Sequence, residues 1–108
     1  MNLFSRLFSH VRQARPPVHK VEIALIQSES IVNLSNEGDG TLDDIKTFIV
    51  QNSNKISFIR HTIVDSEENS KSYTLGLCTI DFETGTMKAS RSELLKQSEI
   101  NKVLNKLV

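Results

Sequence analysis

Apolar and polar residues alternate along residues 18–26. The apolar members are Val21, Ile23 and Leu25, and the residues between them are smaller or charged. A period of two places one set of side chains on the core face of a β-strand. The pattern therefore predicts a strand here, and the short apolar run at residues 31–34 is the expected partner for it.

A helix is expected from about Leu42 to Gln51, directly after a glycine-rich turn. Thr41 is suited to cap the first turn, and Asp43 and Asp44 lie where the helix dipole favours negative charge. Apolar residues recur at helical spacing along the segment. The side chains expected to be buried are Leu42, Ile45, Phe48 and Ile49.

Two further strands are predicted at Ile56–Val64 and Tyr73–Phe82, joined by a polar loop at Asp65–Ser72. A short third strand is expected at Thr86–Ala89. A loop symmetric about residues 68 and 69 would place Thr62 opposite Leu75 and Val64 opposite Tyr73. Both faces of this hairpin would then carry apolar groups, and the second face would need to be covered by the N-terminal segment or by another chain.

The last predicted helix begins at Ser90, where Glu93 completes a capping-box pattern. Its buried stripe would comprise Leu94, Ile100, Val103, Leu104 and Leu107. The expected class is α+β: a small antiparallel sheet of three to five strands, in a meander around the long hairpin, with two helices packed on it.

The N-terminal residues 2–14 predict a third, amphipathic helix. Leu3, Phe4, Leu7, Phe8 and Val11 lie on one side of it, and Pro16-Pro17 would end it because proline lacks an amide hydrogen. We therefore divide the chain into an N-terminal arm, residues 1–17, and a single α+β domain, residues 18–108.

Charge distinguishes the arm from the domain, although the chain of 108 residues has a net charge of zero. Residues 1–21 hold four basic residues and no acidic one, whereas the remainder holds nine basic and thirteen acidic residues. Such an arm is consistent with a core helix, an interface helix, a lipid-surface anchor or a mitochondrial presequence. Packing or docking is the commonest fate of an amphipathic helix, and membrane contact by so short a helix would be weak.

No catalytic constellation is visible in the sequence. Cys78 and His61 lie on paired strands, but the cysteine stands in the densest apolar stretch and is expected to be an inert thiol, with His61 a packing residue. His10 and His19 show no metal-ligand spacing. We therefore expect neither an enzyme, nor a metal site, nor a cofactor.

Residues 41–107, read as helix, three strands and helix, resemble the double-stranded RNA-binding fold in outline. In that family, phosphate-binding lysines lie near the start of the last helix, where this chain has Lys88, Arg91 and Lys96. The resemblance implies a nucleic-acid-binding module as the alternative function, although the domain as a whole is acidic.

The preferred interpretation is a small non-enzymatic protein–protein interaction or regulatory module that associates with itself or with another protein. Cytoplasmic location is expected, with a peripheral membrane or mitochondrial matrix location as alternatives. The residues expected to contact the partner are Leu3, Phe4, Leu7, Phe8, Ile59 and Ile63.

Overall fold

The computed structural model describes residues 16–26, 28, 30–66, 69–80, 83–89 and 93–108. The predicted N-terminal helix therefore lies outside the described residues. The same holds for Leu3, Phe4, Leu7, Phe8 and Arg91.

A four-stranded antiparallel sheet forms the centre of the fold, with the order β2-β1-β3-β4. Its strands are β1 (Val18–Leu25), β2 (Ile31–Ser35), β3 (Ile56–Ser66) and β4 (Asn69–Leu75). The two most buried strands, β1 and β3, occupy the middle positions, and the polar strand β4 is an edge. The predicted pairing of the first two strands is confirmed.

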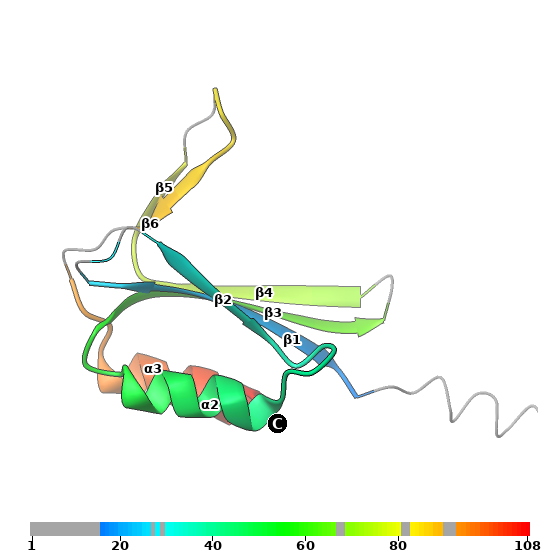
Figure 1. Cartoon of the computed structure of the whole chain (residues 1–108). Helices are drawn as coiled ribbons and strands as arrows, with labels where there is room; N and C mark the ends of the chain where they lie inside the picture. Colours follow the sequence, from blue (N-terminus) through cyan, green and yellow to red (C-terminus); the bar gives the residue numbers. More distant parts are fainter. Residues whose placement is uncertain (1–15, 27, 29, 67–68, 81–82, 90–92) are drawn as a thin grey trace, which may run out of the picture.

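Two helices pack side by side on one face of this sheet (Figure 1). Helix α2 spans Leu42–Gln51, and its Thr41 and Asp44 form a reciprocal capping box. Helix α3 spans Gln97–Lys106. The predicted α+β class, a small antiparallel sheet with two helices, is thereby confirmed.

The main core lies between the sheet and the two helices. Ile23 and Ile59 pair across β1 and β3 and point toward Ile45 and Ile49 of α2. An antiparallel sheet with only one covered face is normally polar on the other. The buried residues of this core are Val21, Ile23, Ile45, Ile49, Ile56, Ile59, Leu95, Ile100, Val103 and Leu107.

The opposite sheet face is polar over most of its area, which corrects the expectation of two apolar hairpin faces. Residues 59 and 75 are paired, as are residues 61 and 73, so the register is three positions away from the predicted one. Leu75 and Tyr73 therefore lie on the same face as Ile59. Of the residues expected to form a loop, Asp65 and Ser66 belong to β3 and residues 69–72 belong to β4. Thr62 Oγ1 of β3 and Ser72 Oγ of β4 are 3.0 Å apart across the strands.

A separate hairpin, β5 (Cys78–Ile80) with β6 (Met87–Ala89), projects from the end of the sheet (Figure 1). The predicted strand 73–82 is thus broken after Leu75. The predicted third strand exists, but it pairs only with β5 and not with the main sheet. This arrangement differs from the three-stranded sheet implied by the resemblance to the double-stranded RNA-binding fold.

The last helix begins six residues later than predicted, because its N-cap is Lys96 rather than Ser90 and its first helical residue is Gln97. Glu93 lies in a bend, and residues 94–96 are extended. The capping role falls to Glu99, whose carboxylate accepts a hydrogen bond from the Lys96 amide at 3.4 Å. The chain stays extended because the Leu95 amide donates to the Ile56 carbonyl at 2.9 Å, which ties this segment to β3.

Helices α2 and α3 are each ten residues long. Neither combines the length and the apolar character required to cross a lipid bilayer.

Candidate functional site

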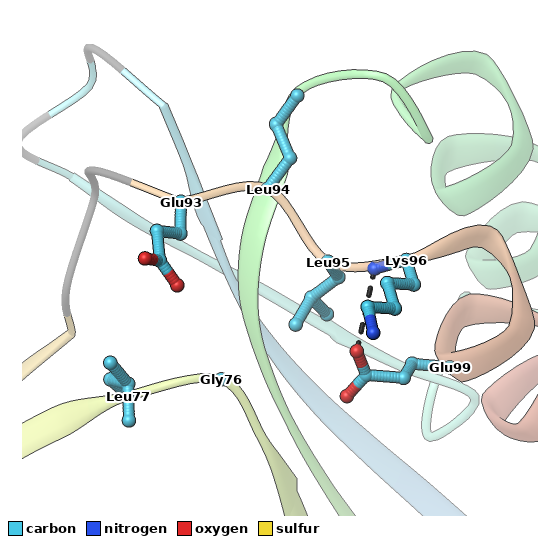
Figure 2. Close-up of a pocket in the computed structure, with 7 residues that line it drawn as sticks. All are labelled: Gly76, Leu77, Glu93, Leu94, Leu95, Lys96 and Glu99. Carbon is cyan, nitrogen blue, oxygen red and sulfur yellow. Dashed lines mark hydrogen bonds between the residues drawn. The ribbon is translucent and has the colours of Figure 1, made fainter.

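A groove lies at the junction of β4, the projecting hairpin and the extended segment before α3 (Figure 2). We call it the leucine groove. Its volume is about 150 Å³. The residues that line it are Gly76, Leu77, Glu93, Leu94, Leu95, Lys96 and Glu99.

Gly76 creates the bend that separates β4 from the hairpin. Its φ of +95° is a conformation that side chains with a Cβ rarely adopt. A Cβ added there would also overlap the main-chain oxygen of Ser57 on β3. The close approach lets the chain leave the sheet at this point and exposes Leu77 immediately after the bend.

We expect Gly76→Ala to lower the free energy of unfolding by about 3 kcal/mol, through backbone strain of about 1–3 kcal/mol and the overlap with Ser57. Gly85→Ala is the matched control, because Gly85 has a φ of +69° but no atom within contact distance of an added Cβ. Thermal or urea unfolding measures both. Equal losses in the two variants would contradict the close approach at Gly76.

The opposite wall of the groove is formed by two consecutive leucines with opposite roles. Leu95 points into the core, and its main-chain amide donates a hydrogen bond to the Ile56 carbonyl. Leu94 points away from Leu95 (Figure 2), and 49% of its surface is exposed. Leu77, across the groove, is 66% exposed. Two apolar side chains thus lie near the solvent, on chain segments that contact β3 at Gly76 and at Leu95.

Charged residues lie at the rim of the groove. Glu93 and Lys96 are exposed, and Glu99 is half-buried in the first turn of α3. The two carboxylates and one ammonium group leave a local excess of negative charge. A partner with apolar side chains and flanking positive charge suits this lining best.

The second cluster of titratable residues is a histidine pair inside the core. His19 on β1 and His61 on β3 are both fully buried, and His19 Nδ1 lies 2.9 Å from His61 Nε2. One ring must donate and the other accept, so at least the accepting ring is neutral in this hydrogen bond. The remaining ring atoms, His19 Nε2 and His61 Nδ1, have no hydrogen-bond partner among the residues that the structure describes.

Burial lowers the pKa of both histidines. For His61 the pKa falls to about 4, because burial disfavours the charged ring and because His19 and Lys106 would repel its charge. Burial also lowers the pKa of His19, with a smaller contribution from Lys46, while the Val108 main chain and Asp65 act in the opposite direction. The pair is therefore neutral at physiological pH.

Tyr73 connects the histidine pair to the surface. Its ring lies 6.4 Å from the His61 ring, and Lys106 Nζ of α3 lies over the tyrosine ring, 3.5 Å from its centroid. This cation–π contact ties the end of α3 to the edge strand β4. Because both histidine rings are shielded from solvent, the cluster offers no surface at which a substrate would meet a base.

The residues predicted from the sequence as sites are separated in the structure. Ile59 is fully buried beneath the helices, so its side chain belongs to the core, and Ile63 is half-buried near the far end of β3. Lys88 is exposed on the projecting hairpin, and Lys96 is exposed at the start of α3. Within the described part of the chain, no group of three or more potential metal ligands comes together.

Sequence reasoning missed both the leucine groove and the histidine pair. The signal for the pair was present, because His19 and His61 occupy the core-facing positions of their alternating strands. An isolated glycine within a strand pattern, Gly76, was the signal for the bend. Cys78 was expected to be buried and is half-buried, and His61 is the packing residue that was expected.

Comparisons with protein-family models, curated proteins and solved structures give no significant match to this chain.

Proposed function

We propose that this protein is a small non-enzymatic interaction module that associates with a second copy of itself through the leucine groove. The observation that carries the proposal is that two exposed leucines, Leu77 and Leu94, are among the residues that line one groove. Exposed apolar side chains with charged residues beside them are typical of protein interaction sites.

The attachment of both walls of the groove to β3 supports this function. Gly76 approaches the β3 main chain closely, and Leu95 is hydrogen-bonded to β3, so both walls are attached to the same central strand. A preorganised surface loses little conformational entropy when a partner binds. The exposed leucines therefore offer binding energy at a low entropic cost.

The test is the association state of the full chain as a function of concentration, measured by sedimentation velocity. We expect a dimer that Leu77→Ser weakens by about tenfold or more, because removal of an anchor side chain costs about 1–2 kcal/mol of binding energy. Val50→Ser is the matched control, since Val50 is similarly exposed, at 58%, but lies on α2 outside the groove. A wild-type protein that remains monomeric at high micromolar concentration would refute the proposed function.

A further inference from the structure

We propose that the leucine groove of one copy binds the N-terminal arm, residues 1–17, of a second copy, so that two copies exchange their arms. This inference rests on the proposed self-association and names the segment that occupies the groove. Four properties of the groove and the arm lead to it: size, area, charge and reach.

The size of the groove suits one aromatic ring. Its volume is about 150 Å³, and an apolar cavity of about 150 Å³ is known to admit a benzene molecule. The arm carries two phenylalanines, Phe4 and Phe8, on the side of the predicted helix that also bears its leucines. Either ring would meet Leu77 on one wall and the chain at Leu94 and Leu95 on the other.

The area of the groove alone is too small for a stable dimer. A specific interface buries about 800 Å² on each partner, whereas the groove is a few side chains wide. A buried phenylalanine contributes about 150–250 Å². Because the groove suits one ring, an exchange of arms gives two such contacts in a dimer, one from each arm, and so doubles the area that a single contact would bury.

The charges of arm and groove are opposite. The arm holds Arg6, Arg12 and Arg15 and no acidic residue. The groove holds Glu93 and Glu99 against Lys96. On a helix Arg12 follows Phe8 by one turn, so a Phe8 ring in the groove would bring a guanidinium group to its acidic rim.

The position of the arm favours the groove of another copy over its own. The arm joins β1 at Val18, which pairs with Val64, whereas the groove lies beside Ser57, seven residues away along β3, or about 23 Å. To reach its own groove the arm would have to run straight back along the sheet. One face is covered by α2 and α3, and the other presents polar side chains such as Arg60. A second copy imposes no such path.

Full-length Phe8→Asp is the first test of this assignment, with Gln13→Asp as the matched control. Both variants add the same charge to the arm, but Gln13 lies on the polar side of the predicted helix. In sedimentation velocity, we expect Phe8→Asp to raise the dimer dissociation constant at least about tenfold and Gln13→Asp to change it less than about twofold. A synthetic peptide of residues 1–15, in excess, should also convert the wild-type dimer to monomer.

A mixing experiment distinguishes exchange between copies from docking within one copy. Phe8→Asp has a defective arm and an intact groove. Leu77→Ser has an intact arm and a defective groove. At a concentration between the wild-type and variant dissociation constants, each variant alone should be mostly monomeric, and an equimolar mixture should form heterodimers through the one intact arm–groove contact. Circular dichroism confirms that both variants are folded. The peptide competition needs no variant of the protein and applies even where one fails to fold.

The outcomes separate the inference from the proposed function. A Phe8→Asp dimer as tight as wild type would overturn the arm exchange and leave the self-association standing. If Phe8→Asp lowered the melting temperature but left the sedimenting mass of the protein unchanged, the arm would dock within its own copy. Loss of binding to phosphatidylserine vesicles, with the dimer unchanged, would show a lipid anchor. Either of these last two results overturns the inference, and a monomeric wild type overturns both it and the proposed function.

Discussion

Lowering the pH from 7.5 to 4.5 should lower the free energy of unfolding by about 3 kcal/mol through the buried histidine pair. Burial holds the pKa of His61 at about 4 in the folded protein, against 6.5 for an exposed histidine. Each unit of difference corresponds to about 1.4 kcal/mol. The loss is large because a domain of this size typically has a stability of about 5–15 kcal/mol.

The sign follows from which state binds more protons. Below pH 6.5 the unfolded chain takes up protons on His19 and His61, while the folded state resists protonation because the pKa of each ring is lowered. Stability is therefore at its full value above pH 6.5 and declines as the pH falls toward 4. The histidines contribute no change above pH 7.5.

The measurement is urea unfolding at a series of pH values, with the double variant His19→Leu/His61→Leu as the comparison. Leucines in both positions remove the titration together with the two unpartnered ring nitrogens. The difference in stability between the two proteins should widen steadily from pH 7.5 to 4.5. Parallel pH profiles would show that the acid sensitivity arises from other groups.

The elements that could be predicted from the sequence are those whose signals are local and undisturbed by tertiary contacts. Helix α2 begins where Thr41 and Asp44 indicate, and both hydrogen bonds of the capping box are present. Helix α3 shows the opposite case. Ser90 and Glu93 have the spacing of a capping box, but the hydrogen bond between Leu95 and Ile56 keeps the chain extended.

The edge strand β4 illustrates a second limit. Its residues 69–72 are polar, which is typical of a loop, yet an edge strand that is exposed at every position but Leu75 tolerates polar side chains. The predicted register was therefore wrong by three positions. An odd error of this kind places every side chain of the strand on the wrong face of the sheet. The predicted second apolar face came from this error and not from the composition of the strands.

The leucine groove depends on both of these tertiary effects and was therefore hidden from sequence analysis. Leu94 was assigned to a buried helical stripe, and it became exposed because the helix starts later. Leu77 was placed within a continuous strand, and it became exposed because the chain bends at Gly76. Both leucines are ordinary apolar residues until the backbone around them is known.

The second large effect is expected at Phe58, which anchors the projecting hairpin. Phe58 and Ala24 are fully buried on the otherwise polar sheet face, where Ile31 and Cys78 pack against them. Truncation of a buried phenylalanine to alanine costs about 3–5 kcal/mol, because apolar contacts are lost and a cavity remains. We therefore expect Phe58→Ala to lower the melting temperature by about 15 °C or more.

Cys78 reports on the same contact, because it is the single cysteine of the chain and lies at the start of β5. Phe58→Ala should accelerate its alkylation by a thiol reagent under native conditions, since the side chain that covers it is gone. Arg60→Ala is the control: it lies on the same sheet face, two residues along β3, and is exposed. Substitution of an exposed residue usually changes stability by less than about 0.5 kcal/mol. If Phe58→Ala and Arg60→Ala had the same melting temperature, and Cys78 were alkylated at the wild-type rate in both, the position of the hairpin would not depend on Phe58.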